Sequence, residues 1–208
     1  MLAHASLYAI LDLGYVRDAD APRLLRQLLE GGVGAVQLRG KNRSADELSA
    51  LAEILLPLTS NADIPFIVND HAEIANRVDV QGVHVGQDDA SIARVRAQVT
   101  RPILVGKSTH SLAQAEAAAA EGADYIGFGP LFATPTKPDY APIGLADIRT
   151  VHEKIAIPIF CIGGIKLENV AAVVAAGAHR VVIVSGLLTA PDVAEYARAT
   201  NVLLNPRF

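Results

Sequence analysis

The chain has 208 residues, of which 51% are hydrophobic and 19% are charged, and this balance is typical of a single globular domain with a full core. Its net charge of −4, without a cluster of lysine and arginine residues, argues against a nucleic-acid-binding surface. A single cysteine excludes an internal disulfide framework, and no apolar run approaches the roughly 18 residues that cross a bilayer, so we expect a cytoplasmic protein without a signal peptide or a membrane partner.

Short apolar segments alternate with longer segments of helical character along the whole chain. Strands are predicted at residues 7–11, 35–39, 65–68, 82–85, 103–107, 125–129, 158–162 and 180–184. Helices are predicted between and after them, at residues 22–30, 45–59, 72–77, 91–99, 112–121, 145–154, 167–176 and 191–200. Ser44 and Glu47 form a predicted capping box at the start of the second helix. Eight such units without a linker predict one domain, residues 1–208, folded as a closed α/β barrel of eight parallel strands.

In such a barrel, function lies on the loops that follow the strands, and the third and fourth strands are each followed by carboxylates. Asn69 and Asp70 follow one strand, and Asp88 and Asp89 follow the next. Because the carboxyl ends of neighbouring parallel strands lie side by side, we expect these acids to converge. One or two carboxylates, completed by substrate phosphates and water, suit Mg²⁺. Alternatively, Asp70 caps the following helix and the other two acids are ordinary loop residues.

Cationic and amide side chains mark the end of the second strand. Strand alternation points Gln37 and Arg39 to the same side, and Lys41 extends past the strand end. Together they suit an anionic ligand. The alternative is a glutamine that fills the barrel and an arginine paired with an acidic residue.

The loops after the fifth and sixth strands carry hydroxyl and cationic groups. Ser108 and His110 follow the fifth strand, whereas Ser111 is better placed to cap the next helix. Residues 129–143 form a long connection, which is typical of a lid or a binding loop, although its prolines could simply stiffen it. Its candidate ligand-binding residues are Thr134, Thr136 and Lys137.

Glycines and a serine follow the last two strands, where barrels of this kind commonly hold a phosphate. Gly163 and Gly164 follow the seventh strand, and Val184 and Ser185 end the eighth. The barrel rim thus offers two predicted anion sites, one here and one near the carboxylates. Two such sites favour a transferase with two phosphorylated substrates over an isomerase that acts on one sugar phosphate.

Nine motifs, in order over nearly the whole chain, resemble those of the thiamine-phosphate synthase family. They are LYAILD (7–12), QLRGK (37–41), VND (68–70), GVHVGQDD (82–89), GKSTH (106–110), GADYIGFGP (122–130), TPTK (134–137), IGGI (162–165) and VS (184–185). The resemblance implies a TIM barrel that joins hydroxymethylpyrimidine diphosphate to a thiazole phosphate alcohol, or its carboxylate form, and releases diphosphate. It implies Mg²⁺ as the cofactor, no protein nucleophile, and loss of diphosphate before the thiazole nitrogen attacks.

The same resemblance implies roles for individual residues. Asp70 and Asp89 would hold Mg²⁺, and Gln37 would meet the pyrimidine. The diphosphate would be bound, and its departure assisted, by Arg39, Lys41, Asn69, Ser108 and Lys137. The thiazole phosphate would be contacted by Thr134, Thr136, Gly164, Val184 and Ser185. The sequence leaves homo-oligomerisation open.

Three alternatives compete with the synthase. A thiazole tautomerase of the same fold would use His110 to move a proton, but that branch tends to lose the Arg39/Lys41 pair and the Thr-x-Thr-Lys motif. A regulatory protein would bind thiamine precursors without turnover. A sugar-phosphate epimerase or isomerase would use only the phosphate site at the last two strands, and would leave Asp70 and Asp89 unexplained.

Overall fold

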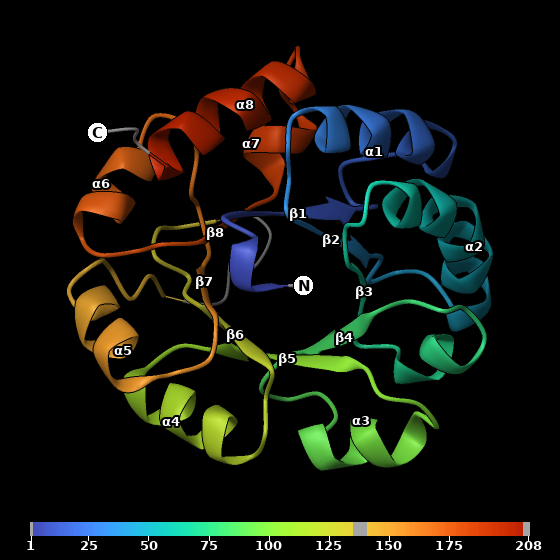
Figure 1. The fold of residues 1–208 in the computed structure, drawn as a ribbon, viewed down its shortest axis with the longest axis horizontal. Helices are drawn as coiled ribbons and strands as arrows, with labels where there is room; N and C mark the ends of the chain where they lie inside the picture. Colours follow the sequence, from blue (N-terminus) through green and yellow to red (C-terminus); the bar gives the residue numbers. More distant parts are fainter. Residues whose placement is uncertain (1, 135–140, 206–208) are drawn as a thin grey trace.

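The computed structural model describes residues 2–134 and 141–205, and within them eight parallel strands close into a barrel in chain order. Helices lie around the outside of this barrel, as Figure 1 shows. The strands are β1 (Leu7–Asp12), β2 (Ala35–Arg39), β3 (Phe66–Asn69), β4 (Gly82–Val85), β5 (Leu104–Thr109), β6 (Tyr125–Phe128), β7 (Ile159–Cys161) and β8 (Val181–Ile183). The predicted barrel of parallel strands is confirmed.

The α-helices are α1 (Ala21–Glu30), α2 (Ala45–Asn61), α3 (Ile92–Gln98), α4 (Leu112–Ala120), α5 (Ile148–Lys154), α6 (Val170–Ala175), α7 (Ser185–Leu188) and α8 (Val193–Leu204). Short 3₁₀ helices are η1 (Leu2–His4), η2 (Asp18–Asp20) and η3 (Ala72–Asn76). The capping box of α2 is confirmed, because the Ser44 hydroxyl accepts from the Glu47 N–H and the Glu47 carboxylate accepts from the Ser44 N–H.

The structure differs from the predicted elements at several places, among them the start of α6 at Val170 and not at 167, and the end of α8 at Leu204 and not at 200. The helix expected at 72–77 is the 3₁₀ helix η3, whose five residues are too few for an α-helix of more than one turn. Strand β5 continues to Thr109, so Ser108 lies within a strand. Helix α5 begins at Ile148 and not at 145, because residues 145–147 form a turn in which the Leu145 carbonyl accepts from the Ile148 N–H at 3.3 Å. The short helix α7 was not predicted.

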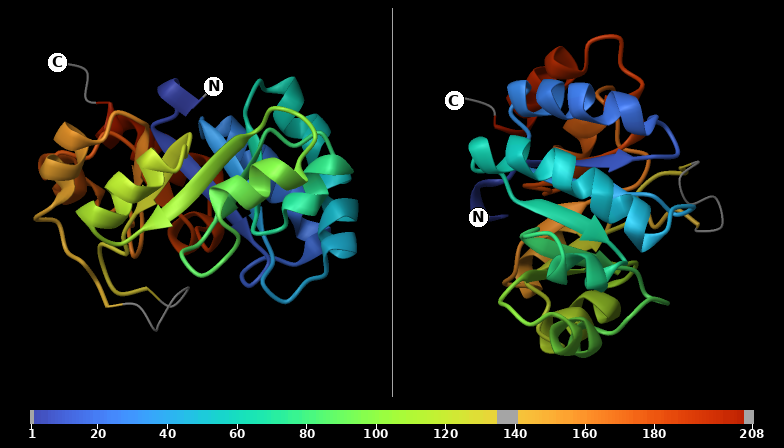
Figure 2. Two further views of the ribbon diagram at one scale, coloured as in Figure 1. Left: turned by 90° about the horizontal axis from the view of Figure 1, so that it is seen from below. Right: turned by 90° about the vertical axis from the view of Figure 1, so that its right-hand side faces the viewer.

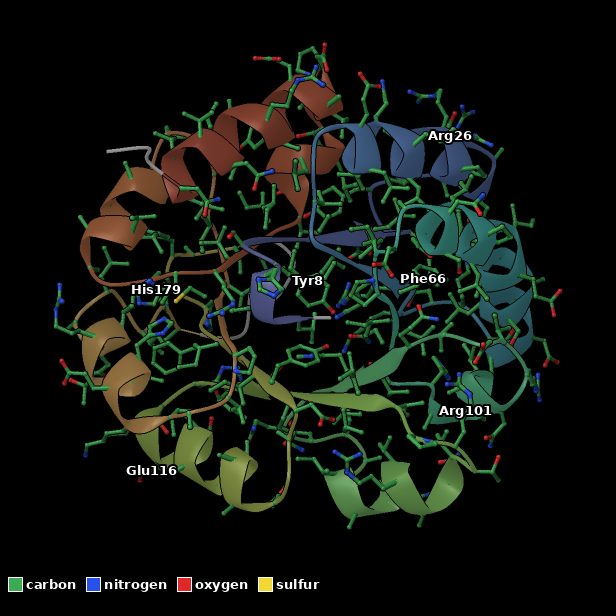
Figure 3. All side chains as sticks on the ribbon, in the orientation of Figure 1. Tyr8, Arg26, Phe66, Arg101, Glu116 and His179 are labelled. Carbon is green, nitrogen blue, oxygen red and sulfur yellow. The ribbon has the colours of Figure 1, made fainter. Side chains whose placement is uncertain are left out.

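Alternation along the strands divides the buried side chains into two groups. Inward-facing residues form a small cluster inside the barrel, whereas outward-facing residues form the larger core between the barrel and the helices. Tyr8 belongs to the first group and Phe66 to the second, and Figure 3 shows Tyr8 inside the ring of strands and Phe66 outside it. The charged side chains of Arg26, Arg101 and Glu116 lie at the outer surface in the same view. The barrel interior is therefore filled by packed side chains, and we call this inner cluster the barrel floor because it lies beneath the loops that follow the strands.

The amino-terminal segment covers the end of the barrel from which the strands start. Figure 2 places η1 at this end, opposite the loops that follow the strands. Leu2 is 5% exposed and Ala5 is 2% exposed, and both pack with Tyr8 in the inner cluster. Gly34 lets this segment approach closely, because a Cβ there would lie 2.6 Å from the Ala5 Cα. The opposite end is left for ligands.

Two histidines that pack against each other, His152 and His179, should make the stability of the protein depend on pH. The ring of His152 in α5 packs edge-on against His179, with centroids 5.0 Å apart. Burial, together with the charges of His179 and Arg180, lowers the pKa of His152 from 6.5 to about 4. Because the unfolded state then binds the proton more readily, stability is complete above about pH 6.5 and falls as the pH drops toward 4. After allowance for solvent screening at a half-buried ring, we expect a loss of about 1–2 kcal/mol.

Urea unfolding at several pH values checks this expectation. In His152→Phe, which keeps a ring but cannot titrate, the dependence on pH over this interval should shrink by that amount. An unchanged dependence in the variant would assign it to other groups.

Candidate active site

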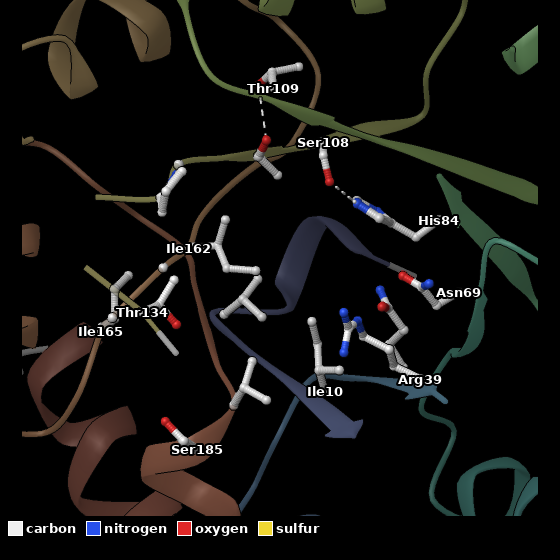
Figure 4. Close-up of a pocket in the computed structure, with 18 of the residues that line it drawn as sticks. Ile10, Arg39, Asn69, His84, Ser108, Thr109, Thr134, Ile162, Ile165 and Ser185 are labelled. Atoms are coloured by element: carbon white, nitrogen blue, oxygen red, sulfur yellow. Dashed lines mark hydrogen bonds between the residues drawn. The ribbon is translucent and has the colours of Figure 1, made fainter. Parts of the chain in front are cut away.

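Eight residues predicted to bind ligands line one pocket at the carboxyl ends of the strands. They are Gln37, Arg39, Asn69, Ser108, Thr134, Gly164, Val184 and Ser185. In Figure 4, Arg39, Asn69 and His84 lie at one side of this pocket, and Thr134, Ile165 and Ser185 lie at the opposite side. The apolar side chains of Ile10 and Ile162 lie between the two sides. Thr136 and Lys137 fall outside the described residues, and their predicted roles stay predictions.

Arg39 is anchored by a buried ion pair at the ends of β1 and β2. Asp12 and Arg39 are cross-strand partners, and the Arg39 guanidinium contacts the Asp12 carboxylate through Nη1. Only 3% of the Asp12 side chain and 11% of the Arg39 side chain are exposed. Asp12 also accepts the N–H of Gly14 at 2.9 Å. The alternative foreseen for Arg39, pairing with an acid, therefore occurs, and the paired arginine still lines the pocket.

The predicted metal ligands are brought together beside Lys41. Asp70 follows β3 in a left-handed conformation, with φ of 64°, and its carboxylate accepts from the Asn69 amide at 2.5 Å. Burial and the neighbouring Asp89 carboxylate raise the pKa of Asp70, and the charge of Lys41 opposes this rise. Asp89 accepts the N–H of Gly86 at 2.8 Å, which folds the loop after β4 back on itself. The expected convergence is confirmed for Asp70 and Asp89.

Ser108 is tied to the barrel floor through His84. Its hydroxyl lies 3.0 Å from His84 Nε2, and His84 Nδ1 lies 3.1 Å from the Tyr125 hydroxyl. Tyr125 lies 3.2 Å from the Tyr8 hydroxyl, which accepts from Gln37 Nε2 at 2.8 Å. A continuous chain of hydrogen bonds thus crosses the barrel from Gln37 to Ser108.

His84, Tyr8 and Tyr125 were not among the predicted site residues. A usable signal was present, because the alternation that places Gln37 and Arg39 inward also places Tyr8 on the inner face of β1 and His84 on that of β4. A polar residue on the inner face of a barrel strand is therefore a candidate in its own right.

His110 lines the same pocket, and its Nδ1 contacts the carbonyl oxygen of Gly129. Because a carbonyl can only accept, Nδ1 carries a proton. The predicted cap at Ser111 is confirmed, since its hydroxyl accepts from the Gln114 N–H at 3.3 Å.

The loop after β7 requires its glycines. Gly163 and Gly164 have φ of 97° and 63°. A Cβ on Gly163 would lie 2.3 Å from the Pro130 Cβ, and one on Gly164 would lie 2.7 Å from the Ala133 carbonyl oxygen. Side chains at these positions would therefore push apart the loops after β6 and β7. The close packing places Gly164 with Ser185 on the pocket wall.

Comparison with known proteins assigns the chain to a family. The family model described as thiamine monophosphate synthase matches residues 7–187. The chain belongs to the thiamine monophosphate synthase family. It is 42% identical over 200 residues to the thiamine-phosphate synthase of Chloroflexus aurantiacus, covering 96% of this chain and 92% of that one. It is 39% identical over 202 residues to that of Halalkalibacterium halodurans, covering 97% and 96%.

A solved structure agrees with this assignment. The thiamine phosphate pyrophosphorylase of Pyrococcus furiosus superposes with a TM-score of 0.87 at 31% identity, covering 96% of this chain and 95% of that one. Membership of the thiamine monophosphate synthase family indicates an enzyme of thiamine biosynthesis. The resemblance of the sequence motifs to this family is confirmed.

Proposed function

We propose that the chain couples hydroxymethylpyrimidine diphosphate with hydroxyethylthiazole phosphate, or its carboxylate form, to give thiamine phosphate and diphosphate. The observation that carries this proposal is the division of the pocket into two polar sides. Arg39 and Asn69, with the Asp70 and Asp89 carboxylates nearby, form one side, and Thr134 and Ser185 form the other. Two phosphorylated substrates need two such sites. Membership of the thiamine monophosphate synthase family supports the same conclusion.

The donor set beside Lys41 fits Mg²⁺. Burial and, next to it, the Asp89 carboxylate raise the pKa of Asp70, and a divalent cation between the two carboxylates would relieve their repulsion. Within residues 2–134 and 141–205, no group of three or more histidine, cysteine, aspartate or glutamate side chains could hold a metal. Two carboxylates completed by phosphate oxygens and water are a usual Mg²⁺ arrangement. When bound there, Mg²⁺ would neutralise negative charge on the diphosphate.

The residues of the chain itself would stabilise the departing diphosphate. Arg39, held in place by Asp12, and Lys41 would offer positive charge, and Asn69 and Ser108 would donate hydrogen bonds. Gln37 at the base of the pocket would orient the pyrimidine.

The opposite side of the pocket would hold the second substrate. Thr134 would contact the thiazole, and the main-chain groups of Gly164 and Val184, with the Ser185 hydroxyl, would seat its phosphate. From the family resemblance alone, Thr136 is proposed to join these contacts, and Lys137 is proposed to join the residues that bind the diphosphate.

The reaction we propose uses no protein nucleophile. The single cysteine, Cys161, is buried in β7, and burial raises the pKa of its thiol to about 12. Such a thiol stays protonated and unreactive. The family resemblance further implies that diphosphate would leave first and that the nitrogen of the thiazole would capture the resulting pyrimidine cation.

Diphosphate release from the two substrates, measured with Mg²⁺ and with EDTA, tests this function. We expect release that needs both substrates, that produces thiamine phosphate and that stops in EDTA. Release from the pyrimidine substrate alone, or turnover that survives EDTA, would contradict the coupling reaction or its metal dependence respectively.

The tautomerase alternative keeps one supporting observation, because His110 lines the pocket and holds a proton on Nδ1. Conversion of a thiazole carboxylate phosphate isomer without metal, in a protein that does not couple, would select it. Binding of both precursors without turnover would select the regulatory alternative.

A further inference from the structure

The hydrogen bonds between Gln37 and Ser108 have a direction that the donor chemistry determines. Gln37 Nε2 can only donate, and it lies 2.8 Å from the Tyr8 hydroxyl. Tyr8 is 1% exposed, and among the described residues its hydroxyl bonds to Gln37 and Tyr125. Since Gln37 cannot accept through Nε2, the proton of Tyr8 is left to point at the Tyr125 oxygen.

The same argument continues through the next two residues. Tyr125 accepts from Tyr8, so its own proton points at His84 Nδ1, 3.1 Å away. A neutral histidine that accepts at Nδ1 carries its proton on Nε2. Nε2 then donates to the Ser108 hydroxyl, 3.0 Å away, and the Ser108 proton is left to point into the pocket.

We infer that this one-way chain makes the Ser108 hydroxyl a hydrogen-bond donor to the pocket ligand, and that Tyr125 is the positioning residue that transmits the direction from the barrel floor to His84. Because the Ser108 hydroxyl donates, the pocket should bind an anionic oxygen beside Ser108 in preference to a ligand group that can only donate a hydrogen bond. The inference rests on the proposed function only in naming diphosphate as that anion.

Two features keep this series of hydrogen bonds in place. Burial raises the pKa values of Tyr8 and Tyr125 well above their usual range, so both phenols stay protonated and remain donors. The Tyr125 ring is also held rigidly, because a Cβ on Gly106 would lie 2.1 Å from its Cζ. It packs edge-on against Tyr8 and Phe160, with ring centroids 6.0 Å and 5.8 Å apart.

The tautomer of His84 in the ligand-free protein gives the first test. Nitrogen-15 NMR of the histidine rings, assigned with His84→Gln, should show the proton of His84 on Nε2. Tyr125→Phe removes the donor to Nδ1 and should mix the two tautomers. A proton on Nδ1 in the wild type would reverse the chain and overturn the inference. This readout needs no ligand and no turnover.

Binding of inorganic diphosphate with Mg²⁺, measured by calorimetry, gives the second test. Ser108→Ala should weaken binding about tenfold and Tyr125→Phe about fivefold, as expected for hydrogen bonds to a charged group. If Tyr125 acts through Ser108, adding Tyr125→Phe to Ser108→Ala should have almost no further effect. Independent, multiplicative effects in the double variant would overturn the inference. Tyr15→Phe, on a tyrosine that is 37% exposed, is the matched control and should bind like the wild type.

Two outcomes separate this inference from the proposed function. A wild type that binds no diphosphate but keeps the Nε2 tautomer would refute the proposed ligand and leave the direction of the chain established. Should Tyr125→Phe not fold, Tyr8→Phe replaces it. This variant removes the donor that turns the Tyr125 proton toward His84, so it should mix the two His84 tautomers and weaken diphosphate binding less than Ser108→Ala does. An unchanged Nε2 tautomer in Tyr8→Phe would show that the direction does not come from Tyr8 and would overturn the inference.

Discussion

Replacing Asp89 by asparagine should lower the Mg²⁺-dependent kcat/KM for coupling by about a thousandfold, because it removes one of the two carboxylates proposed to hold the metal beside the diphosphate. The loop should survive the change, since the carbonyl oxygen of asparagine can accept the N–H of Gly86 as the carboxylate does at 2.8 Å. Diphosphate release at increasing Mg²⁺ concentrations measures the effect, and high Mg²⁺ should restore part of the activity.

The matched control is Asp88→Asn, which removes the same charge one residue away and should keep most of the activity. Both variants should retain the unfolding free energy of the wild type within about 0.5 kcal/mol. Equal losses of activity in the two variants would point to general electrostatics and argue against a metal site at Asp89.

Arg39→Gln should destabilise the fold by about 3–5 kcal/mol and also weaken diphosphate binding. The substitution leaves the Asp12 carboxylate, which is 3% exposed, without its partner, and an uncompensated buried charge carries a cost of this size. Asp12→Asn should destabilise the protein similarly, because it leaves the arginine alone. Urea unfolding measures both effects.

The double variant separates stability from binding. With neither charge present, Asp12→Asn combined with Arg39→Gln should recover most of the lost unfolding free energy. Its activity should remain low, because the cation proposed to bind diphosphate is still missing. Recovery of both would assign Arg39 a purely structural role, and failure to recover stability would mean that the pair does not act as a unit.

The barrel could be predicted because its strands carry local signals. Residues 35–39 lie between Gly34 and Gly40, residues 82–85 begin at Gly82 and are followed by Gly86, and the two segments match β2 and β4 at both ends. The errors arise where tertiary contacts override such signals. Strand β5 continues past the lysine at 107 because Ser108 and Thr109 pair with Gly127 and Phe128 of β6, a partner that the local sequence does not reveal.

The sequence predicted which residues lie at the candidate site, but it did not predict the contacts that they make with one another. Strand ends indicated Asn69, Asp70 and Asp89, because the rule that loops after parallel strands carry function needs only the order of elements. The pairing of Asp12 with Arg39 depends on the register of β1 against β2, which no spacing along the chain gives. The roles assigned to these residues stay predictions.

The plug of Leu2 and Ala5 beneath Tyr8 gives the pocket a single mouth. A ligand near Gln37 reaches solvent through the space between Arg39 and Ser185, because the other end of the barrel is closed. We therefore expect the substrate that binds near Gln37 to bind before the other one, and the joined product to leave through the same opening. Product inhibition patterns measure this order.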